Sequence, residues 1–84
     1  MIFTVVWTAY AEDRLADIWL GSSDRDAVNN AADWINYHLR NDPNLKGLSE
    51  DGFFFFAFEP LGVWFEISEE DRLVRIVEVG RYSQ

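Results

Sequence analysis

The stretch from Gly52 to Gly80 constrains the fold most, because it carries three apolar segments separated by two turn signals. The first segment contains four consecutive phenylalanines, Phe53–Phe56. Pro60 and Gly62 follow at spacings that suit the second and fourth positions of a tight turn. The acidic run Glu69–Asp71 separates the second segment from the third, as expected for a surface connection. This pattern predicts three consecutive antiparallel strands.

The N-terminal half begins with a β-branched and aromatic segment, Ile2–Trp7. With Thr4 as its single polar residue, this segment predicts a strand that is buried on both faces. Thr8 can cap a helix that follows, in which apolar residues recur at spacings of three and four. Gly21 is predicted to end this helix in the left-handed conformation.

A second helix is predicted directly afterwards. Ser23 can cap it, with Asp26 three residues later in a pair that resembles a capping box. Asn41–Pro43 should end it, because the residue before proline avoids the α region, and Asn44–Asp51 should form a loop. We therefore predict one α+β domain over residues 1–84. Its antiparallel helix hairpin packs on one face of a four-stranded antiparallel sheet, in which the N-terminal strand lies beside the meander.

Counting through the two turns predicts how the strands pair and which side chains share a face. With Glu59–Gly62 as the first connection, the expected pairs are Phe55–Glu66, Ala57–Trp64, Ser68–Leu73, Glu66–Arg75 and Trp64–Val77. Because side chains alternate along a strand, one face should pack against the helices; it carries Phe54, Phe56, Phe58, Val63, Phe65, Ile67, Val74 and Ile76. The opposite face should carry Phe53, Phe55, Trp64, Glu66, Arg75, Val79 and Arg81.

We predict that this opposite, mixed face binds a partner. The predicted partner-binding residues are Phe53, Phe55, Trp64, Glu66, Arg75 and Arg81. Its aromatic residues Phe53, Phe55 and Trp64 could stack on nucleic-acid bases or contact a protein. The sequence has 15 acidic and 7 basic residues and a formal net charge of −8. This charge opposes attraction to phosphate backbones, so a protein partner is preferred to nucleic acid.

Composition also bounds the location and the chemistry of the chain. Without cysteine, it has neither disulfides nor thiolate metal ligands. The first residues lack the features of a signal peptide, and no apolar run is long enough to cross a membrane. We therefore expect a cytoplasmic protein without a membrane partner.

Three polar features each have two interpretations. Glu66 and Arg75 could be an acid and its orienting cation, although a cross-strand ion pair is the preferred explanation. His38, the sole histidine, could be a general base, but a surface position near a helix C-terminus is preferred. The run Glu69–Asp71 resembles a metal site only superficially, because adjacent carboxylates on a solvated turn rarely converge on one ion. We predict neither a metal nor a cofactor.

The order of a strand, a helix hairpin and an antiparallel meander resembles the RelE/ParE toxin superfamily over essentially the whole chain. The resemblance rests on Trp7–Thr8, Leu15–Trp19, Leu39, Asp42–Pro43, Leu45–Gly47, Pro60–Leu61, Val63–Glu66 and Val77–Gly80. It implies a bacterial toxin of a type II toxin–antitoxin pair. Such toxins divide into ribosome-dependent mRNA endonucleases and gyrase inhibitors. An extended or helical antitoxin segment wrapped around the toxin neutralises both kinds.

The resemblance also implies where nuclease residues should lie, and most of them are missing. The nuclease branch has lysines where this chain has Phe53 and Phe55, and an arginine where it has Gly62. Only Arg81, followed by Tyr82, matches the basic cluster after the glycine of the last strand. Because several cations are needed to stabilise the transferring phosphate, the sequence favours a protein without nuclease activity. Arg81 and Tyr82 are its only remaining catalytic candidates.

Three functions therefore stay open. The preferred one is a toxin-like protein that acts by binding an antitoxin, a cellular target such as gyrase, or both. The second is a ribosome-dependent mRNA endonuclease. The third is an acidic interaction module or nucleic-acid mimic that retains only the fold, with a homodimer as one form.

Overall fold

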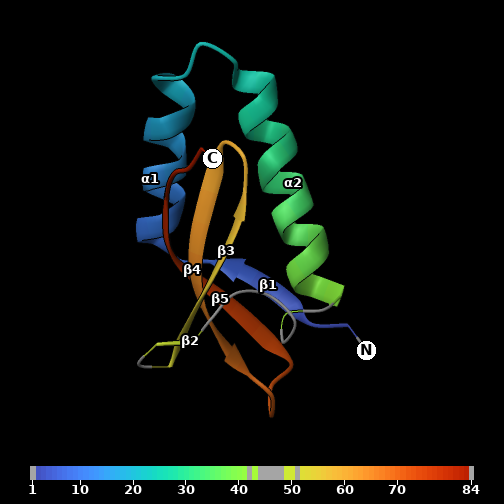
Figure 1. Cartoon of the computed structure of the whole chain (residues 1–84). Coiled ribbons are helices and arrows are strands. Elements are labelled where there is room, and N and C mark those ends of the chain that lie inside the picture. Colours follow the sequence, from blue (N-terminus) through green and yellow to red (C-terminus); the bar gives the residue numbers. More distant parts are fainter. Residues whose placement is uncertain (1, 42, 44–48, 51, 84) are drawn as a thin grey trace.

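A computed structural model describes residues 2–41, 43, 49–50 and 52–83. Its elements are β1 (Thr4–Trp7), α1 (Ala9–Leu20), α2 (Arg25–Asn41), β2 (Ser49–Glu50), β3 (Phe53–Phe58), β4 (Leu61–Ser68) and β5 (Leu73–Arg81). The strands form one sheet in the order β1-β5-β4-β3-β2, and both helices cover the same face of it (Figure 1). The predicted α+β fold, with a helix hairpin on one sheet face, is confirmed.

The sheet differs from the prediction at its two edges. Strand β1 lies beside the meander as expected, but it pairs with β5 in the parallel direction, so the sheet is mixed. A parallel pair needs a long connection, and two helices and three strands separate β1 from β5. At the other edge, Ser49–Glu50 pairs with β3 as the short strand β2, within the segment predicted as a loop. The rest of that segment, 44–48 and 51, lies outside the described residues.

Helix α1 begins as predicted but ends differently. The Thr8 hydroxyl accepts a hydrogen bond from the Ala11 N–H at 3.2 Å, which confirms the N-cap. Gly21 has a φ of −87°, so the predicted left-handed end is wrong. Two arginines satisfy the last carbonyls instead: Arg25 donates to Trp19 and Leu20 at 3.1 Å, and Arg81 donates to Ile18 at 3.3 Å.

Helix α2 begins one residue later than its predicted cap implies. The Asp24 carboxylate, rather than Ser23, accepts a hydrogen bond from the Ala27 N–H at 3.1 Å. A carboxylate at this position also interacts favourably with the positive end of the helix dipole, which explains why Asp24 is used. The helix extends through Asn41, so its predicted end is confirmed.

The first hairpin has a shorter connection than predicted. Strands β3 and β4 extend to Phe58 and Leu61, which leaves only Glu59–Pro60 between them. Phe55 therefore pairs with Trp64 rather than Glu66, and Ala57 pairs with Gly62 rather than Trp64. This error shifts the register by two residues, and because side chains alternate with a period of two, the predicted faces of β3 and β4 are unchanged.

The second hairpin contains a β-bulge that the count of residues did not anticipate. The pairs Ser68–Leu73 and Glu66–Arg75 are confirmed, but Trp64 pairs with Glu78 instead of Val77. Val77 is the extra residue, and an extra residue reverses the faces of those that follow it. Val79, predicted on the mixed face, is consequently buried in the core with 0% exposure. Arg81 likewise reaches toward α1.

The core lies between the helices and the sheet. Its buried apolar residues are Phe3, Ala11, Ile18, Val28, Ala31, Ile35, Leu39, Leu61, Val63, Phe65, Val74, Ile76 and Val79. Of the predicted helix-facing residues, Phe54, Phe56 and Ile67 pack against this core and are partly buried. Phe58 remains 37% exposed, because it lies at the end of β3, where its ring stacks on Trp34 at a centroid distance of 5.9 Å.

Candidate protein-binding surfaces

Phe55, Trp64 and Glu78 of the sheet and Arg14 of α1 line a hollow of about 270 Å³, which we call the aromatic hollow. It is lined by Arg14, Phe55, Gly62, Trp64, Glu78, Val79, Gly80, Arg81 and Tyr82. The Phe55 ring lies 5.0 Å from that of Trp64 and 5.9 Å from that of Tyr82, between centroids. A Cβ at position 62 would lie 2.8 Å from the Phe55 ring, so a larger residue there would force that ring to shift.

The arginines at this hollow already have partners within the chain. Arg14 Nε lies 3.5 Å from a Glu78 carboxylate oxygen, and the Arg81 guanidinium donates to the Ile18 carbonyl at 3.3 Å. Nearby on the same sheet face, Arg75 Nε donates to Glu66 at 2.8 Å, and a second guanidinium nitrogen contacts the same oxygen. The preferred interpretation of Glu66 and Arg75 as an ion pair is therefore confirmed. All three cations are engaged before any ligand arrives.

The predicted partner-binding residues are brought together only in part. Phe55, Trp64, Arg81 and Tyr82 line the aromatic hollow, whereas Phe53 lies on the same sheet face outside its lining. The exposed fractions of Phe53 and Trp64 are 38% and 39%. The predicted position of Arg81, with its side chain on the mixed face, is corrected by its hydrogen bond to α1.

Sequence reasoning missed two charged residues of the hollow, Arg14 and Glu78, for identifiable reasons. Glu78 reaches this face only because the bulge at Val77 shifts the alternation of β5. Arg14 comes from α1, and the count of residues along the strands gives no information about helix residues. Nothing in the sequence pattern around either residue indicates a site.

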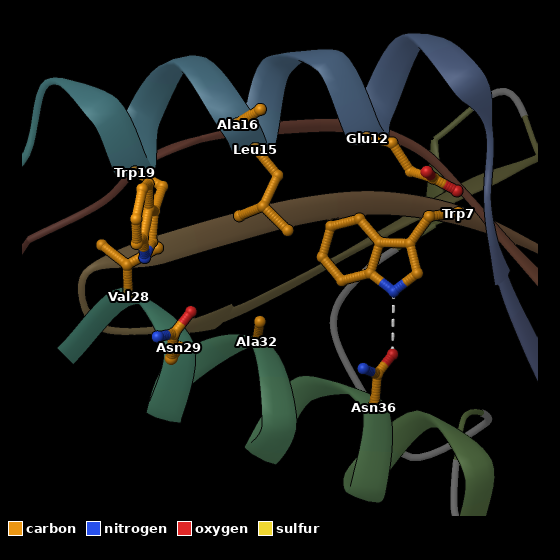
Figure 2. A pocket seen from close by; sticks show the side chains of 9 residues that line it. All are labelled: Trp7, Glu12, Leu15, Ala16, Trp19, Val28, Asn29, Ala32 and Asn36. Atoms are coloured by element: carbon orange, nitrogen blue, oxygen red, sulfur yellow. Dashed lines mark hydrogen bonds between the residues drawn. The ribbon is translucent and has the colours of Figure 1, made fainter. Parts of the chain in front are cut away.

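A second concave surface, which we call the helix groove, lies between α1 and α2 and has a volume of about 420 Å³. It is lined by Trp7, Glu12, Leu15, Ala16, Trp19, Val28, Asn29, Ala32 and Asn36 (Figure 2). In Figure 2, Leu15 and Trp19 project from α1 toward α2. The Arg25 guanidinium lies over the Trp19 ring at 4.5 Å from its centroid, so this tryptophan is held in place.

Trp7 forms the opposite end of the helix groove. It was predicted in a strand buried on both faces, but it is only half-buried. Its indole N–H donates to the Asn36 side-chain oxygen at 2.8 Å (Figure 2). This hydrogen bond orients the Trp7 ring at its end of the helix groove. Leu15 and Trp19 belong to the apolar stripe of the predicted helix, and a stripe does not show whether two helices leave a groove between them, so the groove was not predicted. Asn29 and Asn36 lie beside the apolar stripe of α2 and line the helix groove. These polar residues are the sequence signal that this side of α2 is partly solvated.

The helix groove has a clear electrostatic character. Glu12 is among its lining residues, and none of the described lining residues is lysine or arginine. Together with the net charge of −8 on the whole chain, this lining favours a basic segment over an acidic one.

Other site types find no support among the described residues. No cluster of three or more histidine, cysteine or acidic side chains in this part of the chain could hold a metal ion. None of its helices combines the length and the apolar character needed to cross a membrane. The His38 ring stacks on Trp34 at 5.6 Å and meets Phe56 edge-on at 5.7 Å. It packs among aromatic rings and does not line either concave surface.

Comparisons with known proteins identify the fold. Neither a family model nor a curated protein sequence matches the chain. A structure of the RelBE2 toxin–antitoxin complex from Mycobacterium tuberculosis matches with a TM-score of 0.78 and 18% identity, covering 98% of this chain and 100% of that one. The ParDE toxin–antitoxin system of P. aeruginosa gives 0.73 and 15%, with 98% of both chains covered.

A third structure is free E. coli RelE with two arginines replaced by alanine. It matches with a TM-score of 0.67 and 14% identity, covering 96% of this chain and 84% of that one. These matches extend over nearly the whole chain at low identity, and they confirm the resemblance drawn from the sequence at the level of the fold. The chain therefore has the fold of the RelE/ParE toxins.

Proposed function

We propose that the chain is the toxin-like component of a bacterial type II toxin–antitoxin pair and acts by binding proteins. Its partners in this proposal are an antitoxin and a cellular target such as gyrase. Support comes from the fold, because two of the similar structures are a toxin–antitoxin complex and a toxin–antitoxin system. At identities of 18% and 15% these structures share the fold with this chain, so the proposed binding role rests on the chain's own surfaces.

The observation that carries the proposal is the helix groove. Trp7, Leu15 and Trp19 offer apolar surface in a hollow of about 420 Å³, and buried aromatic contacts dominate the energy of protein interfaces. Glu12 and the acidic chain around it favour a basic partner. An amphipathic antitoxin helix with one apolar stripe and basic flanks has this chemistry, and it is a common way of filling a groove.

The aromatic hollow supports protein binding over nuclease chemistry. Arg14 is paired with Glu78, and Arg81 donates to the Ile18 carbonyl, so this hollow offers fewer unpaired cations than the several that phosphoryl transfer needs. One observation favours the alternative function, a ribosome-dependent mRNA endonuclease: Arg14, Arg81 and Tyr82 do line the same hollow. Measuring mRNA cleavage in a translating extract distinguishes protein binding alone from endonuclease activity.

We expect no mRNA cleavage when the chain is added to a translating bacterial extract, because stabilising a phosphoryl-transfer transition state needs several aligned cations. Cleavage is measured by primer extension on a reporter mRNA, with and without ribosomes. Ribosome-dependent cuts that disappear in Arg14→Ala and Arg81→Ala, but persist in the Arg75→Ala control, would establish the endonuclease instead.

We expect Ala16→Arg to weaken binding of the chain to the protein encoded by the adjacent reading frame by at least about tenfold, because it places a bulky cation in the helix groove. Ala16 is exposed and lines the groove, so the change need not disturb the core. The matched control, Ala9→Arg, adds the same charge at another exposed position of α1 outside the groove. Affinity is measured by isothermal titration calorimetry.

Two outcomes count against the proposal. Equal affinity of the Ala16→Arg and Ala9→Arg variants places the antitoxin elsewhere on the molecule. Expression of the chain in bacteria without any growth inhibition, and without a co-purified protein, removes the toxin–antitoxin function altogether.

A further inference from the structure

Helix α2 carries an exposed aromatic surface that belongs to neither concave site. Asn30, Trp34, Tyr37 and Asn41, which we call the outer seam, follow one another at spacings of four, three and four. This is the spacing of the seam residues in a pair of coiled helices. Trp34 is 47% and Tyr37 is 51% exposed. In Figure 1, α2 lies at one flank of the helical layer, with α1 on its other side.

The rings of the outer seam are held in place before any partner binds. Trp34 stacks on His38 at 5.6 Å and on Phe58 at 5.9 Å, and it meets Tyr37 edge-on at 5.7 Å. The Asn41 side chain donates to the Tyr37 carbonyl at 2.7 Å. Side chains that are already ordered lose little conformational entropy on binding, so this surface is preorganised for contact.

The charges beside the seam indicate what kind of partner fits. No seam residue is charged, whereas Glu12 lines the helix groove, so the seam itself offers no ionic contact to a charged segment. Asp33 and Arg40 each precede a seam residue and lie seven positions apart. Both are exposed, and within the described ranges neither forms a salt bridge.

Seven residues correspond to two helical turns, so Asp33 and Arg40 flank the seam on the same side of α2. When two such helices run antiparallel about a two-fold axis, equivalent flanking positions of the two copies face each other. An axis beside Tyr37 places Asp33 of one copy next to Arg40 of the other, and the symmetry repeats this contact. The parallel arrangement gives no such pair of opposite charges.

We propose that the chain forms a homodimer in which the outer seams of two α2 helices pack antiparallel, with Asp33 and Arg40 paired across both edges. The two Tyr37 rings lie near the two-fold axis, and each Trp34 packs against the seam of the other copy. Contact through an uncharged seam brings no like-charged seam residues together, and the Asp33–Arg40 pairs offset part of the repulsion between two acidic copies. The proposal uses neither the helix groove nor the aromatic hollow, so it does not depend on the proposed function.

The exposed rings also set the expected strength of the dimer. An aromatic side chain can bury about 150 to 250 Å², so the exposed fractions of Trp34, Tyr37 and Phe58 together offer roughly 300 Å² per copy. A stable interface buries about 800 Å² per partner. The homodimer is therefore expected to be weak and to form as the concentration rises.

Sedimentation equilibrium of the full chain from about 10 µM to about 1 mM should show a monomer–dimer equilibrium, as expected for a small interface. Replacing both Trp34 and Tyr37 with alanine should raise the dissociation constant at least about tenfold, since aromatic anchors dominate such contacts. Trp64→Ala, which removes an equally large exposed ring from the opposite side of the sheet, should leave it unchanged.

A charge exchange tests the antiparallel arrangement without touching the rings. Asp33→Arg alone and Arg40→Asp alone each place like charges together and should weaken the dimer about tenfold. The double exchange, Asp33→Arg with Arg40→Asp, should restore the original affinity. Circular dichroism checks that every variant is folded. A monomer at the highest concentration, or a double exchange that fails to restore dimerisation, overturns the proposal.

Discussion

Phe65→Ala lowers the free energy of unfolding by about 3 to 5 kcal/mol, the range for truncating a fully buried phenylalanine. Phe65 is among the largest side chains with no exposed surface, and its ring stacks on that of Phe54 at 5.6 Å. Truncation leaves a cavity between the sheet and the helices that neighbouring side chains fill only partly. A small domain with a stability of about 5 to 15 kcal/mol loses much of it.

Urea denaturation followed by circular dichroism measures this loss, with an unchanged dependence on denaturant as the sign that both proteins unfold in the same way. The matched control is Phe53→Ala, which removes a ring that is 38% exposed and should cost about 1 kcal/mol or less. If the two variants lose equal stability, the core does not lie on the helix-covered face of the sheet.

Val79→Asp unfolds most of the protein, because it places an unpaired carboxylate where the side chain has 0% exposure. Such a change costs about 4 kcal/mol or more. Val77→Asp introduces the same residue two positions earlier, at a half-buried site, and should cost only about 1 to 2 kcal/mol. The pair isolates the effect of the bulge, because regular alternation would give positions 77 and 79 the same environment.

Thermal unfolding of both variants, monitored by tryptophan fluorescence, distinguishes the two arrangements. If β5 has a bulge at Val77, the Val77→Asp variant should show a cooperative thermal unfolding transition. The Val79→Asp variant should show little or no transition. Similar transitions for both, or a more severe effect at position 77, would contradict the register of β5.

Sequence reasoning recovered most of the fold because the strongest signals are local. The meander follows from its apolar segments and turn residues, and the Thr8 cap follows from hydrogen-bonding chemistry that involves only nearby residues. The parallel direction of β1 could not be predicted in this way, since the partner of β1 is β5, at the far end of the sequence. Local patterns do not specify the direction in which two distant strands pair.

The bulge shows how a single residue limits such reasoning. In the second hairpin, residue counting gave the correct register from Ser68–Leu73 to Glu66–Arg75. It failed beyond Val77, because no residue type marks the insertion. Val79 was placed on the wrong face of the sheet, and the hydrogen bond of Arg81 to the end of α1 was not anticipated. One irregularity in the backbone was therefore sufficient to misplace part of the candidate site.

The candidate surfaces were predicted less completely than the fold, for a different physical reason. Exposed aromatics such as Trp64 can be inferred from alternation along one strand. The helix groove, however, depends on how far apart α1 and α2 lie, and the apolar stripe that contains Leu15 and Trp19 is the same whether the helices meet or leave a hollow. Whether a surface is concave depends on how the folded chain packs, and no pattern in the sequence indicates it.

The position of β5 in the sheet has a consequence for synthesis of the protein on the ribosome. The strand is flanked by β1 and β4, although it is the last of the described strands in the sequence. During translation β1 emerges first, and it has no neighbour in the sheet until β5 has also left the exit tunnel. The pairing that joins β1 to the rest of the sheet can therefore form only after β5 has been made. A nascent chain that stops before β5 contains both helices but lacks the strand that joins β1 to the meander.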